Sequence, residues 1–517
     1  MAAESNRFTL ITTGDLEAGS NGALQFGYKP EAVLAPGSRL WFIYDIRQDA
    51  GPPQSEYPDQ PNHISVHLNS GTAVSCEGYG ARTLDYYPVL PEFLHVCEIC
   101  LGEGINSGDE LRIDLGSDAG PWRFAQNPID DFKFWLVESS SPEQTFSPTG
   151  YKTYRKFAPS VDPDAKEDQP LSVSAKFRGM YPAFAPENTR KTPGILWGEI
   201  HGMVFNQRPL DDYYNYAKHI AKYDFAAPML FSYNTCVGNV WDHVRDTADR
   251  FTEPGEFVAI SGVEFGTPPD GSHRNAHFFH HVGVPPIFFE ERPPALEERF
   301  TRRFHPDTVF CKDLDHFYKT IKQFGGIVTG HFHTLEFHRE ILGELWQKQT
   351  GSAAEEERMF LLLNQGMRLG LVCASDTHDS MPGNPAPEPG CPQTAGFMAV
   401  LSDDLSRESI HRAILDRRVY GTTGARIALY LDVSNNPMGS ILPLSTPRTF
   451  SLKVEGSDAL EKVDLIRDGL VIQSVESGDR TWEGELSDPQ GDASHWYVVR
   501  VTQVDGHRAW SSPTWFE

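Results

Sequence analysis

Hydrophobic and polar positions alternate along the first third of the chain with the two-residue period of β-strands. Such runs are RLWFIYDI (39–46), HISVHL (63–68), ELRIDLG (110–116) and FKFWLVE (132–138). Clusters of Gly, Pro, Asn and Asp separate them, as turns separate strands. The pattern predicts an N-terminal β-sandwich over residues 1–155. The Pro- and charge-rich stretch that follows, residues 156–193, is typical of a connection between domains.

From Gly194 the period changes, and short apolar runs alternate with amphipathic segments. The strand-like runs lie at 194–198, 225–231, 257–265, 326–332 and 369–375. The helix-like segments lie at 210–222, 313–324 and 406–418. Strands that alternate with helices predict a parallel sheet, open or closed into a barrel, over residues 194–425.

From residue 426 to the end the chain returns to β-rich runs, among them IALYLDV and HWYVVRVTQV. Turn signals such as RDG and VDG separate these runs, which predicts a small C-terminal β-sandwich over residues 426–517. The expected fold class is therefore α/β, with a central domain flanked by two β-domains.

Charge narrows the classes of partner. The 517 residues carry a formal net charge of −26, so nucleic acid and anionic membranes are not expected to bind. The sequence contains no apolar run of about 18 residues, so no membrane span is expected. The N-terminal residues lack the pattern of a signal peptide. The expected partner is a small-molecule substrate, and a homo-oligomer stays open because the sequence does not identify the oligomeric state.

The cysteines favour a reducing compartment. There are seven, an odd number scattered over a long chain, which predicts reduced thiols and a cytoplasmic location. Cys97 and Cys100 form one C-x-x-C. A structural zinc site needs further ligands and a redox site needs a βαβ setting, and neither is evident around this pair.

Candidate chemistry lies at the ends of the central strands, where potential metal ligands stand two residues apart. The pairs are Glu199 and His201 in WGEIHG, His331 and His333 in TGHFHT, and Asp376 and His378 in ASDTHD. A fourth strand ends with Glu264, and His273 follows in GSHRNAHF. Residues two apart in a strand share a face, and active sites of α/β folds form at the carboxyl ends of strands.

Convergence of these side chains would place several carboxylates in one small cavity. Carboxylates so close repel one another unless a cation lies among them, and imidazole with carboxylate suits zinc, manganese or iron. The strand ends therefore predict a site for divalent metal. For His277 and His280, in HFFHH, a structural role is the better interpretation.

The order of these motifs resembles a known group. G-(D/E)-x-H, G-x-E, G-x-H-R-N, a His pair and S-D-T-H follow one another as in polymerase-and-histidinol-phosphatase (PHP) type domains. The chain looks more closely like the DUF3604 family of uncharacterised proteins related to that superfamily. The likeness extends through RRVYGTTGARI (417–427) and the terminal VRVTQVDGHRAWSSPTWF.

The resemblance implies a distorted (β/α)7-type barrel with a centre of one to three divalent ions (Zn, Mn or Fe) and hydrolase activity. Carried over by position, the metal ligands are His201, Glu264, His273, His331, His333, Asp376 and His378.

The sequence also departs from the family pattern. Glu199 stands where the family usually has Asp, and Met203 where it usually has a second His. The segment FAAPMLFSYNT lacks the usual Asp-His pair, and Cys236, just after it, is an alternative ligand. These departures put a full set of three ions in doubt.

The resulting hypothesis is a metal-dependent hydrolase that uses metal-activated water on a small ester, phosphoester or amide-type substrate. Asp376, His378 or Glu199 would take or return a proton. The candidate substrate-binding residues are Arg274, Asn275, Arg418, Tyr420 and Arg426. For Arg418 and Arg426, ion pairing or packing is an equal alternative. Two other classes stay open: a metal-dependent lyase acting on a small organic acid, and a degenerate barrel that serves as a binding module.

Overall fold

β-Strands dominate the computed structural model of the protein, with 45% of its residues in strands and 14% in helices. The structure describes residues 7–14, 16–45, 51–82, 94–125, 128–139, 171–181, 184–204, 210–236, 239–267, 272–289, 304–330, 340–348, 353–386 and 393–517. The described residues form two compact units, one up to residue 181 and one from residue 184 onward.

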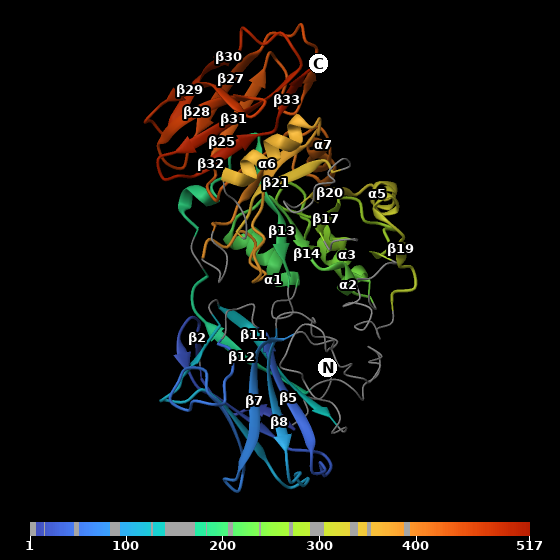
Figure 1. Ribbon diagram of the computed structural model, residues 1–517, viewed down its shortest axis with the longest axis vertical. Helices are drawn as coiled ribbons and strands as arrows, with labels where there is room; N and C mark the ends of the chain where they lie inside the picture. The colour runs from blue at the N-terminus through green and yellow to red at the C-terminus, as the bar shows by residue number, and fades with distance from the viewer. Residues whose placement is uncertain are drawn as a thin grey trace. The chain divides into compact units, whose positions relative to one another are not determined.

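The first unit is built on one ten-stranded sheet that curls into a half-barrel and is mostly antiparallel. Its strands, in spatial order, are β1 (Phe8–Leu10), β4 (Leu24–Tyr28), β9 (Leu111–Leu115), β6 (Ile64–Leu68), β7 (Ala73–Arg82), β8 (Leu94–Leu101), β5 (Ser38–Asp45), β11 (Ile129–Ser139), β12 (Leu171–Arg178) and β2 (Leu16–Glu17). Strands β3 (Asn21–Gly22) and β10 (Trp122–Arg123) pair separately. The labels β5, β7 and β8 mark neighbouring strands in Figure 1.

Aromatic side chains fill the concave interior of this sheet. The rings of Phe26 and Phe134 lie 4.8 Å apart, and those of Phe42 and Phe26 lie 4.9 Å apart. Phe42 and Phe134 occupy buried positions of two of the alternating runs, so the predicted β-structure is present there, whereas Phe26 lies on β4, outside the predicted runs. The predicted sandwich is wrong, however, because the strands join in one continuous sheet.

The second unit contains two principal sheets. The eleven-stranded sheet runs β15 (Val258–Ala259), β14 (Phe225–Met229), β13 (Ile195–Met203), β23 (Phe397–Leu401), β24 (Val419–Thr422), β32 (Arg508–Ser511), β31 (His495–Gln503), β28 (Leu460–Arg467) and β29 (Leu470–Glu476), with β33 (Thr514–Phe516) and β26 (Ile441–Leu442) attached. The five-stranded sheet runs β16 (Ser261–Thr267), β17 (Ser272–Phe278), β20 (Ile327–Gly330), β21 (Leu342–Trp346) and β22 (Gly370–Cys373).

Two smaller sheets complete the strands of this unit. One has β25 (Ala428–Val433), β27 (Thr449–Glu455) and β30 (Thr481–Ser487), and the other has β18 (Ile287–Phe289) and β19 (Val309–Cys311). The apolar face of the three-stranded sheet joins the same hydrophobic core as β28 and β31.

The described helices are η1 (Pro186–Thr189), α1 (Leu210–Asn215) continued by the π-helix η2 (Tyr216–Ile220), α2 (Ser232–Thr235), α3 (Val240–Phe251), α5 (Leu314–Gln323), α6 (Ala353–Asn364) and α7 (Arg407–Leu415). Helices occupy the three predicted amphipathic segments, at α1 with η2, at α5 and at α7, and the structure adds η1, α2, α3 and α6, which the sequence pattern did not predict. Asp313 caps α5 by accepting a hydrogen bond from the His316 N–H, 2.8 Å away, and Gly325 follows with a positive φ of 67°. No helix among these described segments is long and apolar enough to cross a bilayer.

The predicted (β/α)7-type barrel is wrong. Strand β13 pairs antiparallel with β23, β23 with β24, and β17 with both β16 and β20. A barrel of that type needs a helical crossover between successive parallel strands. Only four residues separate β16 from β17, which is enough for a hairpin but not for a crossover. A mostly-β unit with mixed sheets results.

Strands from both sides of residue 425 share one sheet, because β24 pairs antiparallel with β32. The division into domains at residues 155, 193 and 425 remains a prediction. The structure itself shows the two compact units described above.

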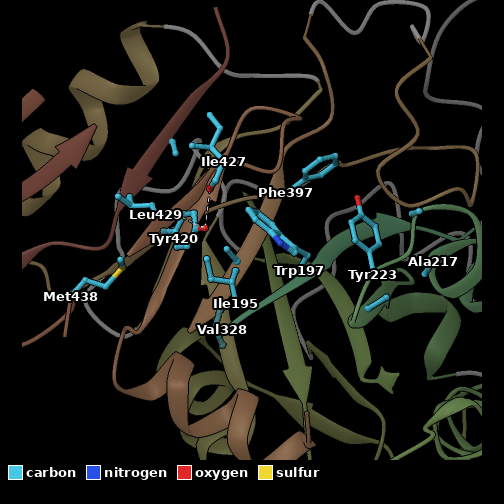
Figure 2. Packing of buried hydrophobic residues seen from close by; sticks show 14 of the residues in the cluster. Ile195, Trp197, Ala217, Tyr223, Val328, Phe397, Tyr420, Ile427, Leu429 and Met438 are labelled. Atoms are coloured by element: carbon cyan, nitrogen blue, oxygen red, sulfur yellow. Dashed lines mark hydrogen bonds between the residues drawn. The ribbon is translucent and has the colours of Figure 1, made fainter. Parts of the chain in front are cut away.

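A hydrophobic core underlies the first strand of the second unit (Figure 2). Trp197, on β13, packs edge-on against Tyr420, on β24, with ring centroids 5.9 Å apart. The Tyr420 hydroxyl donates a hydrogen bond to the Ile427 carbonyl, 2.9 Å away. Because both side chains are buried, this packing fixes β13, the strand that carries the residues considered next.

Candidate metal centre

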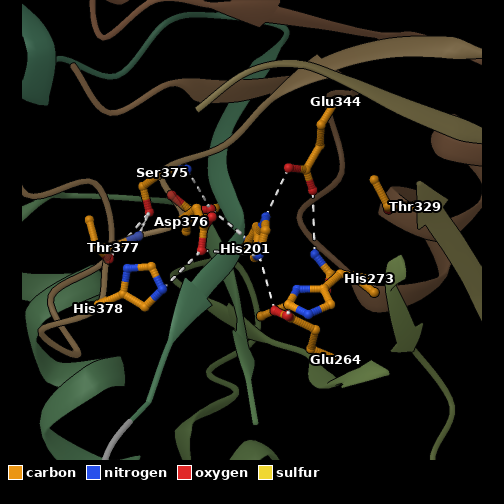
Figure 3. Close-up of polar contacts among 12 residues, drawn as sticks. His201, Glu264, His273, Thr329, Glu344, Ser375, Asp376, Thr377 and His378 are labelled. Carbon is orange, nitrogen blue, oxygen red and sulfur yellow. Dashed lines mark hydrogen bonds and ion pairs between the residues drawn. The ribbon is translucent and has the colours of Figure 1, made fainter. Parts of the chain in front are cut away.

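Strands from the two principal sheets bring four charged side chains together (Figure 3). His201 lies on β13, Glu264 on β16 and Glu344 on β21, and Asp376 follows β22. Backbone hydrogen bonds join the two sheets beside the cluster, since the Glu264 N–H donates to the Leu230 carbonyl, 2.9 Å away. All four residues are buried.

The imidazole of His201 is the centre of this cluster. Its Nδ1 atom lies 2.8 Å from Glu344 Oε2. Its Nε2 atom lies 3.3 Å from Glu264 Oε2 and also 3.3 Å from Asp376 Oδ1. One ring therefore contacts three carboxylates that come from three different elements.

The loop that carries Asp376 is fixed by its backbone. The Asp376 N–H donates to the His201 carbonyl, 2.6 Å away, and the Met203 N–H donates to the Thr377 carbonyl, 2.9 Å away. Glu199 adds a side-chain tie, because its Oε1 accepts from the N–H groups of His201, at 2.6 Å, and Ser375, at 3.2 Å. The backbone of Asp376 adopts a φ of 48°, a left-handed conformation that Asp tolerates better than most residues.

Two further histidines lie at the edge of the cluster. His273 Nδ1 is 2.6 Å from Glu264 Oε1, and the His273 side chain is half exposed. His378 Nε2 is 3.7 Å from Asp376 Oδ1, with 23% of its side chain exposed. These two imidazoles are the members of the cluster that reach solvent.

The electrostatics show that the cluster requires positive charge. Burial lowers the pKa of His201, but attraction to Asp376 and Glu344 outweighs burial and raises it well above its usual value. Burial raises the pKa of Asp376 to about 6. Burial also acts to raise the pKa of Glu264, but the charges and hydrogen bonds of His273 and His201 hold it well below its usual range. The three carboxylates thus favour positive charge at the cluster, whether a proton on the imidazole or a bound cation supplies it.

The donor set suits a divalent cation in its chemistry, imidazole with carboxylate, and in the two separations that involve His201 Nε2. Two ligands about 2.0 Å from a tetrahedral zinc lie about 3.3 Å apart, which matches the separations from His201 Nε2 to the two carboxylates. Nearby, the buried atoms Glu199 Oε2, Asn275 Oδ1 and His277 Nδ1 have no hydrogen-bond partner. No three His, Cys, Asp or Glu side chains of the described residues already surround one point as metal ligands do. The predicted ligands His331 and His333 lie outside those residues.

Of the predicted substrate-binding residues, the structure brings Asn275 to the cluster and Arg274 to the other face of the same sheet. Asn275 pairs with Glu264 across β16 and β17, so both side chains share a face. Asn275 Nδ2 donates to Glu344 Oε1, 3.4 Å away. Arg274 Nε instead donates to the Tyr318 hydroxyl, at 2.8 Å, and to Glu340, at 3.0 Å.

The other three predicted substrate-binding residues lie elsewhere in the second unit. Tyr420 belongs to the hydrophobic core, and Arg418 lines an open groove beside Tyr430 and Lys453. Arg426 is buried and donates to the backbone carbonyls of Arg190, at 3.0 Å, and of Ala221 and Lys222, both at 2.9 Å. The structure therefore places none of these three in contact with His201.

Sequence reasoning missed Glu344 and set His277 aside. The run ILGELW, around Glu344, repeats the pattern of ILWGEI, around Glu199: an apolar strand interrupted by Gly-Glu. An acidic residue inside an apolar strand is costly to bury without a partner, and that signal could have identified it. His277 lies on the face of β17 that carries Asn275, and its Nε2 is 3.1 Å from Thr329 Oγ1.

Comparison with known proteins adds relatives but no activity. No family model matches the chain. Uncharacterized proteins of Chlamydia pneumoniae and Chlamydia muridarum are 24% and 23% identical to it over 367 and 373 residues, 63% and 64% of this chain. The matched region spans 58% of each relative, so the chain covers less than two thirds of their length.

The likeness to solved structures is weak. A calcium binding mutant of Bacteroides uniformis β-glucuronidase 2 aligns with 99% of this chain and 60% of its own, at 9% identity and a TM-score of 0.21. A crystal structure of Bacteroides uniformis β-glucuronidase aligns over similar shares, at 9% identity and a TM-score of 0.19. Scores this low do not indicate a shared fold.

A substitution at Arg426 tests whether its role is structural. Arg426→Lys replaces a guanidinium that donates to three carbonyls by an ammonium that cannot reach all of them. We expect the free energy of unfolding to fall by about 2–5 kcal/mol, measured by urea denaturation. Affinity for Zn²⁺ should stay unchanged. Arg190→Lys, at a surface ion pair, is the control and should cost less than about 1 kcal/mol.

A second prediction concerns pH and His277. Burial lowers the pKa of His277 to about 3, against an ordinary value of 6.5. Between these values the unfolded chain binds a proton that the folded chain does not, so stability falls as pH drops from 6.5 towards 3. We expect His277→Gln to remove up to about 1.4 kcal/mol per pH unit of that slope in urea denaturation of metal-free protein. A slope that His277→Gln leaves unchanged would contradict this prediction.

Proposed function

We propose that the chain is a metal-dependent hydrolase that acts on a small ester, phosphoester or amide-type substrate. The observation that supports this proposal is the convergence of three buried carboxylates on the single imidazole of His201. Burial of several ionised carboxylates is costly unless positive charge compensates them. Clusters of buried ionisable groups with strongly shifted pKa values are typical of functional sites, metal-dependent active sites among them.

Each residue of the cluster has a distinct part in this proposal. His201 Nε2, Glu264 and Asp376 would hold the cation, which when bound supplies Lewis-acid polarisation of the substrate and activation of water. Glu199 orients the Asp376 loop through the N–H groups of His201 and Ser375. His378, partly exposed beside Asp376, would exchange a proton with solvent in this proposal.

The half-exposed imidazole of His273, held by Glu264, would meet the substrate at the edge of the site. His331 and His333 remain candidate ligands by sequence alone. The resemblance to PHP-type proteins, which first suggested hydrolysis, stays an expectation beside these contacts. A small substrate suits the site because, among the described residues, the charged groups at its centre are buried and the two edge histidines are the exposed members of the cluster.

The decisive experiment combines metal analysis with turnover. Purified protein should hold at least about one equivalent of Zn, Mn or Fe, and a screen across esters, phosphoesters and amides should find a substrate. Hydrolysis in ¹⁸O-labelled water should place the label in the product. Asp376→Asn keeps the size of the side chain but removes its charge, and kcat should fall at least about 100-fold.

Asp313→Asn is a suitable control, since Asn also caps helices and α5 should be retained. This variant should keep both its metal and its turnover. Metal-free wild-type protein that turns over at the full rate, or an Asp376→Asn variant as active as wild type, would contradict the proposed function. An unsaturated product without the label would indicate elimination instead of hydrolysis.

A further inference from the structure

Glu344 stands apart from the other carboxylates of the cluster because it faces the opposite side of the His201 ring (Figure 3). Its Oε2 atom contacts Nδ1 at 2.8 Å, whereas Glu264 and Asp376 contact Nε2 at 3.3 Å. The two nitrogens of an imidazole point in divergent directions. A cation bound to Nε2, on the side of Glu264 and Asp376, would therefore not contact Glu344.

The contact at Nδ1 assigns the hydrogen on that atom. An N···O separation of 2.8 Å is that of a charge-assisted N–H···O hydrogen bond, and an ionised carboxylate only accepts. Nδ1 of His201 therefore carries a hydrogen and donates it to Glu344. In the neutral ring the lone pair then lies on Nε2, on the side of Glu264 and Asp376.

Glu344 is itself held in one orientation. Its Oε1 accepts a hydrogen bond from Asn275 Nδ2, at 3.4 Å, while Oε2 accepts from His201. Strand β21 lies between β20 and β22 in the sheet, and the glutamate is buried there. With both oxygens engaged and no access to water, the carboxylate has little freedom to turn away from the ring.

We propose that Glu344 is a positioning residue that holds His201 with its hydrogen on Nδ1 and so presents Nε2, with Glu264 and Asp376, to a divalent cation. The inference rests on the proposed metal-dependent function. A carboxylate behind a metal-binding histidine fixes the orientation of the ring and strengthens it as a ligand. Glu344 thus acts through His201 and does not touch the metal or the substrate.

The experiment measures metal affinity directly. Metal-free wild-type protein is titrated with Zn²⁺ and with Mn²⁺ by calorimetry, beside Glu344→Gln, Glu264→Gln and Asp376→Asn. Glu344→Gln should weaken binding by about 10–100-fold, and loss of a true ligand should weaken it more. At saturating Co²⁺ the visible spectrum of Glu344→Gln should match that of wild type, because the ligand set is unchanged. Glu264→Gln and Asp376→Asn should alter that spectrum.

Two further variants separate positioning from stability. Glu340→Gln removes another buried glutamate, on the opposite side of the sheet beside Arg274 and Tyr318, and should leave the Zn²⁺ affinity unchanged. Asn275→Ala keeps the charge of Glu344 but frees its Oε1, and should weaken Zn²⁺ binding by a smaller factor than Glu344→Gln. If Glu344→Gln does not fold, Asn275→Ala carries the test.

The outcomes are distinguishable. Equal affinities of wild type and Glu344→Gln for both metals would overturn the positioning role and leave the proposed function standing. If Glu344→Gln instead shows the altered Co²⁺ spectrum of Asp376→Asn, Glu344 is a metal ligand. That result would also overturn the positioning role. Wild-type protein that binds neither Zn²⁺ nor Mn²⁺ would overturn the positioning role together with the proposed function.

Discussion

The structure of the second unit depends on one interaction, the contact of a buried imidazole with three buried carboxylates. Each of these groups loses its hydration on folding, and only mutual attraction or a bound cation offsets that loss. His201, Glu264, Glu344 and Asp376 come from four separate segments, so all four must hold their places at once. The backbone ties between β13 and the Asp376 loop, and the aromatic packing beneath β13, serve this requirement.

The cluster also explains the roles of polar residues that lie in its motifs but are not among its four charged groups. Glu199 appears in the same motif as His201, yet it accepts backbone hydrogen bonds and holds the loop. Asn275 appears in a motif that suggests substrate contact, yet it donates to Glu344. Around a buried charge, side chains that orient the charged groups are as necessary as the groups themselves.

Much of the site could be predicted from local patterns. A charged residue at the end of an apolar strand is costly to bury, so His201, Glu264 and Asp376 stand out in the sequence, and the structure brings them together. The face of the sheet to which each neighbouring side chain points could not be predicted, because it depends on pairing with strands far along the chain. The register that places Asn275 opposite Glu264 turns Arg274 away, and nothing in HRN shows that register. The same limit explains the wrong barrel, since strand order and direction arise from partners far along the chain.

The left-handed backbone at Asp376 restricts how this position can change over time. Few residues other than Gly, Asn and Asp adopt a φ of 48° without strain. Glutamate would preserve the negative charge but strain the turn, whereas asparagine would preserve the turn and lose the charge. The backbone at this position therefore tolerates substitutions that lose the negative charge, but it disfavours the substitution that would keep it. A lineage that lost the proposed activity would be expected to carry Asn or Gly at this position.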